Sequence, residues 1–537
     1  MSTVSNDVSP TARVSTVRKN WVLCVVSLTT FMVFVDANVV NTALPTIARD
    51  FAATNSTLQW VVNSYSLLVA GLLLIGGTTG DRFGRRKMLA FGVIIFGGGA
   101  TGAALSSSTD VLIFARGLQG VGAAMMLPQT LSIITDVFDR HERAKAIAVW
   151  AAFSGIAAGF GPVLGGLLVD HIGWESVFWL HLPVVAAILI GLSIVPESRD
   201  SRHTPLDIPG AILGTGGILA VVYGIIQGPQ SGWTSTEILS FFVLGGVLLA
   251  AFGIVEARSR HPMLPVRYLR QPDFIGPAMV VMVLVIAMSG IFFFTTQFLQ
   301  LVQGRSALMA GVALAPIAGT MMLGAGIAMK AGRSAGPRTL SILGSLIVMG
   351  AIAVLTLIEV DGSYAVPIVS MAISGFGFGI VMPTATDTIM AAVPVDEAGR
   401  GSSMNDTSRE LGFALGVAIL GSIGTSIYRS KVTDDLAGVA SSQVVRDVAD
   451  SLGSLGQVTT LLPPEVASVV TSVANEAFVS AMRIGVFAAI GVVGLTIAIA
   501  LLTMPKKMRA RQAELDEDDA APNGRPAVAD EVVEPLG

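Results

Sequence analysis

Apolar segments long enough to cross a lipid bilayer recur along the whole chain. A helix needs about 20 mostly apolar residues to cross roughly 30 Å of hydrocarbon. Fourteen such stretches can be delimited, at 21–45, 59–79, 88–106, 111–134, 146–168, 177–195, 207–227, 236–256, 274–301, 308–329, 339–358, 364–392, 408–428 and 479–504. Only 13% of the residues are charged, which is about half the share found in a typical soluble protein. The sequence therefore predicts an all-α integral membrane protein with 14 transmembrane helices.

The basic residues give an independent check on the number of spans. Lys and Arg concentrate in the cytoplasmic loops of membrane proteins. If both termini are cytoplasmic, 26 of the 33 Lys and Arg residues fall in inward segments, 6 fall outside and Arg116 lies within a span. A missed or invented span would reverse every later loop and destroy this alternation. We therefore expect 14 spans and two cytoplasmic termini.

The spans divide into two sets of six with a pair between them. We expect an N-terminal tail at 1–20, a six-helix bundle at 21–195, two linker helices at 207–256, a second six-helix bundle at 274–504 and a disordered cytoplasmic tail at 505–537. Within the second bundle, the polar segment 429–478 is predicted to be a long extracytoplasmic loop with short amphipathic pieces that form an exposed helical hairpin. The acidic tail contains Pro and Gly, a composition typical of disorder.

Two ionisable side chains lie deep inside the predicted spans of the first bundle. Asp36 is near the middle of 21–45, and Arg116 is about a third of the way into 111–134. A charge at such depth is costly unless it is paired or faces water, so it indicates a functional site. Asp36 is the only acid well inside the first six spans and is the natural partner of Arg116. Two interpretations remain, a proton-binding site and a static ion pair.

Two glycine-containing segments of the first bundle suggest close or moving contacts. The loop between the second and third spans reads GDRFGRRK, and Asp81 among its basic residues suggests a latch between helices, whereas a mere topology marker is the alternative. In the span 146–168, Gly155, Gly159, Pro162 and Gly166 share one helical face. Small residues at this spacing let two helix backbones approach, and proline permits a bend.

The second bundle offers weaker candidates. Gln297 and Gln300 follow three consecutive phenylalanines, Asp387 lies near the inner end of its span, and Glu410 lies next to Arg409 at the start of another. Each of these side chains either lines a cavity or is an ordinary polar residue at an interface.

Other chemistry finds little support. Cys24 is the single cysteine, so no disulfide can form within the chain, and neither C-x-x-C nor H-E-x-x-H spacings occur. A G-x-x-x-x-G-K-[ST] phosphate loop is absent, which argues against an ATP-driven pump. No nucleophile or pair of acids lies within the spans. We expect no enzymatic activity, no cofactor and no metal.

Together these motifs resemble the major facilitator superfamily, and within it the fourteen-span drug:proton antiporter family. The loop resembles motif A of the superfamily, with Gly80, Asp81, Gly84, Arg85 and Arg86 as its gating residues. Arg116, Gln119 and Gly120 resemble motif B, whose arginine is assigned to proton transfer, and Gly155, Gly159, Gly161, Pro162, Gly165 and Gly166 resemble motif C, which marks antiporters. Asp36, Asn41, Ala43, Leu44 and Pro45 resemble a first-span motif of the fourteen-span family.

The chain departs from the family pattern in two places. Where the family usually has an arginine and an asparagine after the fifth span, this sequence has Glu175 and His181. In the second bundle the counterpart of motif A, MKAGRSAGPR, has no acid.

The resemblance implies a proton-driven multidrug exporter of the cytoplasmic membrane that confers antibiotic resistance. Asp36 and Arg116 would couple proton movement, and Asp36, Gln297, Gln300 and Asp387 would line the substrate cavity. The expected partners are protons, the bilayer and an amphipathic, often cationic, small molecule such as a drug, dye or antibiotic, with no nucleic acid, and the chain is expected to act as a monomer. The alternative cargo is an endogenous lipid, siderophore or metabolite. A receptor or scaffold is disfavoured by the charges within the spans.

Overall fold

The computed structural model describes residues 15–199, 207–259, 262, 268, 270–393 and 398–507, and within them it consists of helices joined by turns. Thirteen helices in this part of the chain are long and apolar enough to cross a membrane, and the shorter apolar helical stretch Ser176–Gly191 occupies the sixth predicted span. The prediction of an all-α polytopic membrane protein is confirmed. Most of both predicted tails, 1–14 and 508–537, lies outside the described residues.

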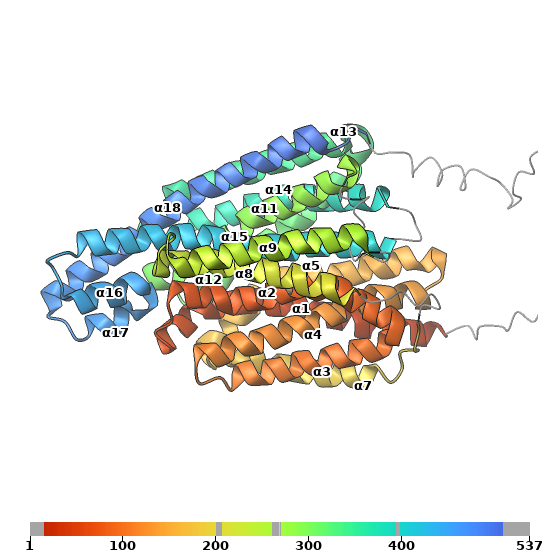
Figure 1. The fold of residues 1–537 in the computed structure, drawn as a ribbon, viewed down its shortest axis with the longest axis horizontal. Coiled ribbons are helices and arrows are strands. Elements are labelled where there is room, and N and C mark those ends of the chain that lie inside the picture. Colours follow the sequence, from red (N-terminus) through yellow and green to blue (C-terminus); the bar gives the residue numbers. More distant parts are fainter. Residues whose placement is uncertain are drawn as a thin grey trace, which may run out of the picture.

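The first half of the chain forms one helical bundle (Figure 1). Its helices are α1 (Thr16–Asp50), α2 (Asn55–Phe83), α3 (Arg85–Ala104), α4 (Thr109–Val137), α5 (Arg140–His171), α6 (Ser176–Trp179) and α7 (His181–Gly191). Helices α1, α2 and α4 have side-chain N-caps. The N-cap residues Ser15, Thr54 and Ser108 each accept a hydrogen bond from the backbone N–H three residues further along the chain. Helices α2 and α3 pack on α4, and α1 packs on α5.

The second half repeats this packing with different helix breaks. It contains α11 (Pro272–Gln297), a π-helical turn (Phe298–Val302), α12 (Ala307–Leu314), α13 (Pro316–Val354), a 3-10 turn (Leu355–Leu357), α14 (Ala365–Ala391), α15 (Ala398–Asp435) and α18 (Pro464–Thr503). Helix α13 holds two predicted spans joined at Gly336, where φ is +70° and the helix kinks. Helix α13 packs on α14, and α11 packs on α15 and α18.

Helices α8 (Ile208–Ser231) and α9 (Thr236–Arg258) form the pair between the halves. Helix α8 contacts α2 of the first half and α15 of the second, while α9 packs mainly on α8. Figure 1 shows both helices at the middle of the molecule, running along its long axis with the other helices. The pair therefore contacts both halves mainly through α8.

The segment 429–478, predicted as an exposed helical hairpin, contains short helices and contacts the end of α1 as a cap. Helices α15 and α18 extend into it and are joined through α16 (Ser442–Asp450), a 3-10 turn (Leu452–Ser454) and α17 (Leu455–Thr459). Ser451 Oγ donates to the carbonyl oxygen of Ala53 at 2.7 Å, and Gln457 Nε2 donates to that of Arg49 at 2.7 Å. The cap thus lies on the end of α1. We call this end of the molecule the cap end, and the opposite end, where α1 begins and α18 ends, the terminal end (Figure 1).

Candidate functional site

The centre of the candidate site is a buried ion pair between α1 and α4. Arg116 NH1 donates to Asp36 Oδ2 at 2.6 Å and to Gln119 Oε1 at 2.9 Å. Gln119 Nε2 in turn donates to Asp36 Oδ1 at 3.1 Å. Asp36 is 0% exposed and Arg116 is 1% exposed. The structure therefore joins the two charges that the sequence predicted to meet, and it adds Gln119 as a bridge between them.

Glycines on α4 allow the backbone approach that buries this pair. A Cβ on Gly120 would lie 2.5 Å from the carbonyl oxygen of Tyr65 on α2, and one on Gly122 would lie 2.6 Å from the backbone nitrogen of Phe96 on α3. Arg116 and Gln119 are three residues apart and share one face of α4. The centre of the Tyr65 ring lies 4.4 Å from the Arg116 guanidinium carbon, so a cation–π contact adds to the pair.

His181 is a third titratable side chain in the same site. It is the first residue of α7, and it is 1% exposed. Its Nε2 lies 3.6 Å from Asp36 Oδ1, and its Nδ1 lies 3.3 Å from the carbonyl oxygen of Phe178. Sequence reasoning noted His181 only as a departure from the family pattern. That departure was the signal that could have placed it in the site.

The loop between α2 and α3 forms an ionic network at the terminal end. Asp81 Oδ1 accepts hydrogen bonds from Arg85 Nε at 3.0 Å and from Arg85 NH2 at 2.9 Å, and Arg85 NH1 also pairs with Asp136 at the end of α4. Gly84 has a φ of +112°, a backbone conformation that favours glycine.

A second set of contacts fastens the same loop to the segment after α7. Arg86 NH1 donates to the carbonyl oxygen of Val195 at 3.1 Å, and its backbone N–H donates to Glu197 Oε1 at 3.1 Å. All of these partners belong to the first half. In this conformation the motif-A residues bind the first half together, and sequence reasoning missed Asp136 and Glu197 because both are distant in the chain.

The motif-C glycines place α5 between two neighbours. A Cβ on Gly159 would lie 2.4 Å from Ala318 Cβ, and one on Gly166 would lie 2.4 Å from the carbonyl oxygen of Ala307. On the other side, a Cβ on Gly161 or Gly165 would lie 2.8 Å from Asn38 Cβ or 2.4 Å from Thr42 Oγ1 on α1, whereas one on Gly155 meets nothing within 4 Å. Pro162 also belongs to this contact, because its carbonyl oxygen lies 2.1 Å from the position of a Cβ on Gly311. The motif therefore joins the two halves backbone to backbone.

Hydrogen bonds between the halves cluster toward the cap end. Asp170 at the end of α5 accepts from the backbone N–H groups of Ala307 and Leu308, both at 2.9 Å, which places a carboxylate on the N-terminus of α12. Gln300 Nε2 donates to the carbonyl oxygen of Thr42 at 3.0 Å, and Arg49 NH2 donates to that of Gln300 at 2.9 Å. These bonds join the two halves at the cap end. Sequence reasoning missed Asp170.

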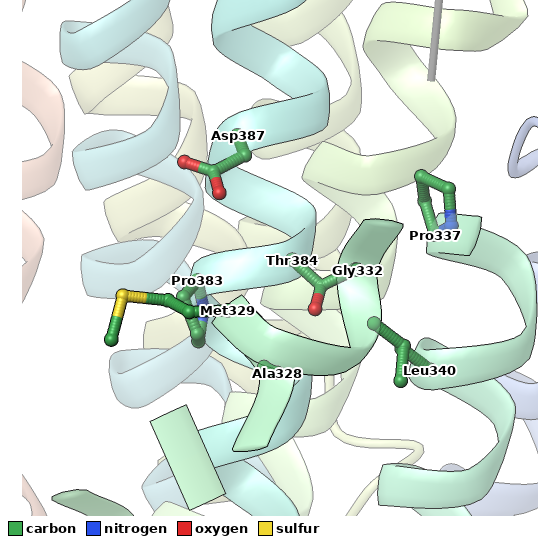
Figure 2. Close-up of a pocket in the computed structure, with 8 residues that line it drawn as sticks. All are labelled: Ala328, Met329, Gly332, Pro337, Leu340, Pro383, Thr384 and Asp387. Atoms are coloured by element: carbon green, nitrogen blue, oxygen red, sulfur yellow. The ribbon is translucent and has the colours of Figure 1, made fainter. Parts of the chain in front are cut away.

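The other candidates of the second half lie apart from the ion pair. The side chain of Gln297 is buried and contacts the carbonyl oxygen of Phe293 within its own helix. Asp387 lines a pocket of about 40 Å³ between α13 and α14 together with Thr384 and Gly332 (Figure 2). The structure brings neither of them to Asp36.

Glu410 comes nearer to the first half. Its Oε1 lies 3.5 Å from Arg409 NH2, and the Arg409 guanidinium carbon lies 4.8 Å from the centre of the Phe34 ring on α1. Of the acids considered in the second half, Glu410 is therefore the one linked to α1, through Arg409.

Comparison with known proteins decides the family. A family model described as the Major Facilitator Superfamily matches residues 26–417. The chain belongs to the major facilitator superfamily. The Multidrug efflux pump LfrA of Mycolicibacterium smegmatis is 34% identical over 481 residues, which cover 89% of this chain and 94% of that protein. The Tetracenomycin C resistance and export protein of Streptomyces glaucescens is 30% identical over 504 residues, which cover 92% of each chain.

Solved structures show the same fold. A bacterial homologue of the human lysosomal transporter Spinster, in an inward-facing and occupied conformation, matches with a TM-score of 0.61 at 17% identity, covering 91% of this chain and 97% of that one. The predicted family and fold are thus confirmed, and the superfamily is one of transporters, not of enzymes. The count of 14 spans and the cytoplasmic position of the termini stay predictions.

Proposed function

We propose that this major facilitator protein exports amphipathic, preferentially cationic small molecules across the cytoplasmic membrane in exchange for protons. The observation that carries the proposal is the buried pair of Asp36 and Arg116, which puts one titratable acid against one permanent cation inside the first half. The names of the two relatives, a multidrug efflux pump and a resistance and export protein, support export of drugs.

Asp36 can act as the exchange residue because its charge decides how strongly Arg116 is held. Arg116 keeps its charge at all accessible pH values. When Asp36 is ionised, it neutralises Arg116 across 2.6 Å. A proton on Asp36 removes that attraction and frees the guanidinium to move. A substrate cation that approaches Asp36 competes with the same proton, so binding of one favours release of the other.

Access to both sides of the membrane then requires the halves to rock. In the observed conformation the cap end is closed by Asp170 on α12 and by the contacts of Arg49 and Gln300. Opening that end must break these bonds and separate the glycine faces of α5 and α12. Because the closed contacts lie at the cap end, we assign the observed state to the half of the cycle in which the site opens toward the terminal end.

The test is transport of ethidium, a cationic dye, in everted membrane vesicles. The unsubstituted protein should accumulate the dye in the vesicle lumen only while a proton gradient exists, and an uncoupler should abolish the accumulation. Asp36→Asn should lose uphill transport yet retain exchange of dye for dye, because an amide mimics the protonated acid. Asp110→Asn is the matched control, since Asp110 is an exposed acid in the first turn of α4.

Uphill ethidium transport at the unsubstituted rate by Asp36→Asn would overturn the assignment of the site, and Glu410 would be the next acid to test. A second candidate function is export of an endogenous metabolite, favoured by the name of the tetracenomycin relative. It predicts proton-driven transport of a neutral or anionic compound and no preference for ethidium.

A further inference from the structure

His181 lies next to one oxygen of the Asp36 carboxylate, and Arg116 binds the other oxygen. The two side chains come from different helices, α7 and α4. Asp36 Oδ2 is bound by Arg116, whereas Oδ1 faces Gln119 at 3.1 Å and His181 Nε2 at 3.6 Å. The charged and titratable groups around the imidazole are Asp36 on α1 and Arg116 on α4, with the backbone of α6 below it and the Phe96 ring of α3 at 5.4 Å.

The contact of Nδ1 is the shorter of the two and favours the neutral tautomer that carries its hydrogen atom on Nδ1. A carbonyl oxygen only accepts hydrogen bonds, so the Nδ1 that lies 3.3 Å from the carbonyl oxygen of Phe178 must carry a hydrogen atom to bind there. Nε2 of a neutral ring then presents its lone pair. In the structure this Nε2 is buried and has no hydrogen-bond partner.

An unprotonated Nε2 and an ionised Oδ1 are two acceptors that face each other. Their 3.6 Å separation is slightly longer than a hydrogen bond. One added proton converts this repulsive contact into a hydrogen bond, whether it resides on nitrogen or on oxygen. The pair is therefore built to receive a proton, and a small rotation of either side chain closes the gap.

We propose that His181 is a second proton-binding residue of the transport cycle and that the exchanged proton is held between His181 Nε2 and Asp36 Oδ1. This inference rests on the proposed function. A proton from the aqueous side forms an N–H bond at Nε2 and gives the imidazolium. In the next step that N–H bond breaks and an O–H bond forms at Asp36, so that His181 becomes neutral and Asp36 loses its charge. Arg116 is released in this second step.

The test compares pH profiles of ethidium transport in reconstituted vesicles. The unsubstituted protein should show a limb of the profile within about pH 5–8, the range in which histidine titrates. His181→Gln keeps an amide nitrogen or oxygen near the place of Nε2 but cannot carry the proton. It should lose that limb, and its proton-driven rate should fall about 10²-fold, as expected when a proton-transfer group is removed. Exchange of dye for dye should remain.

Two further variants make the comparison sharp. His181→Asn introduces the residue that the family usually has at this position, and it replaces His181→Gln if that protein does not accumulate in the membrane. His171→Gln is the matched control, because His171 Nδ1 makes the analogous contact with the carbonyl oxygen of Leu167 at 2.9 Å but is exposed on α5. The control should keep the unsubstituted profile.

A measurement on an intact His181 completes the design. The chain has five histidines, and replacing the other four with glutamine leaves His181 as the only source of imidazole 15N signals. Addition of ethidium at constant pH should shift the 15N resonances of His181 between its protonated and neutral positions. Unchanged resonances, or an unchanged pH profile in both His181 variants, would overturn the inference while leaving the exporter intact. An unsubstituted protein whose transport ignores the uncoupler would instead overturn the proposed function itself.

Discussion

The two halves of the molecule use a similar turn between corresponding helices, and among the described side chains the ion pairs at this turn lie in the first half. Gly84 between α2 and α3 has a φ of +112°, and Gly336 inside α13 has a φ of +70°. In each half an arginine two residues after the glycine binds a carbonyl oxygen beyond the last helix of that half: Arg86 binds Val195 at 3.1 Å, and Arg338 binds Met504 at 2.8 Å. The shared geometry indicates that this turn fastens the end of each bundle.

The differences lie in charge and in packing. In the first half Asp81, Arg85 and Asp136 form a chain of ion pairs, and Gly80 is covered by the side chain of Gln129. In the second half Pro337 stands where Arg85 stands in the first, and a Cβ on Gly332 would meet nothing within 4 Å. An arginine thus holds the end of the bundle in both halves. The ion pairs of Asp81, Arg85 and Asp136 belong to the half that also contains Asp36.

The largest expected effect concerns the two arginine–acid pairs. Arg116→Ala leaves Asp36 as an unpaired buried charge and should cost about 3–5 kcal/mol of stability. Arg409→Ala disrupts partly exposed pairs with Asp406 and Glu410 and should cost about 1 kcal/mol or less. Thermal unfolding followed by size-exclusion chromatography in detergent measures both. Equal losses would contradict the contrast between the halves.

Arg116→Lys separates a coupling role from a static one. Lysine keeps the positive charge but loses the planar guanidinium, whose NH1 binds both Asp36 and Gln119 and whose Nε binds the carbonyl oxygen of Val61 at 3.3 Å. We expect the Lys variant to fold and to transport more slowly than the unsubstituted protein, yet faster than Arg116→Ala. Full transport by a folded Arg116→Ala protein would show that the pair only stabilises.

The next effect tests the shared turn. Gly84→Ala and Gly336→Ala both force alanine into the left-handed region, which costs about 1–2 kcal/mol. Gly336→Ala should lose more, because its Cβ would lie 2.1 Å from the backbone carbonyl oxygen of Lys506, whereas that of Gly84→Ala meets the movable carboxylate of Glu197 at 2.6 Å. Gly232→Ala is the control for strain alone, since its φ is +86° and nothing lies within 4 Å. The melting temperature should fall most in Gly336→Ala, less in Gly84→Ala and least in Gly232→Ala. A reversed order would contradict the role of this turn in holding the end of each bundle.

The sequence predicted the fold and the pairing of Asp36 with Arg116 for identifiable physical reasons. The bilayer demands long apolar helices, so the spans could be found one by one. Within the described part of the chain, the helical stretch Ser176–Gly191 is the one that falls below the usual span length. Asp36 and Arg116 could be paired because the first half has no other deep acid. His181 and Asp170 were missed because their partners come from other helices, and the contact depends on how those helices are rotated against each other.

A smaller effect on stability, but a clear one on transport, is expected at Asp81. Asp81→Asn weakens a partly exposed ion pair and should change stability by about 1 kcal/mol or less. Because Asp81 then holds Arg85 less firmly, the arginine is less well oriented toward Asp136 on α4, and turnover should fall while the protein still reaches the membrane. Glu142→Gln is the control, since Glu142 pairs with Lys19 at 2.6 Å outside this loop. Normal turnover in Asp81→Asn would leave the loop as a marker of topology.

The smallest effect concerns the open pocket beside α13. Gly332 lines it with Asp387 and Pro337 (Figure 2), and a methyl group there meets open space. Gly332→Ala should therefore stabilise the protein by about 0.4–1 kcal/mol, because alanine restricts the unfolded chain without strain in the helix. The corresponding change Gly80→Ala should have the opposite sign, since its Cβ would lie 1.8 Å from Gln129 Oε1, and Gln129 is itself held by a 2.7 Å hydrogen bond to the carbonyl oxygen of Gly76. Paired melting curves measure the difference. A loss of stability in Gly332→Ala would mean that the pocket closes on this glycine during the cycle, as Gln129 closes on Gly80 in the first half.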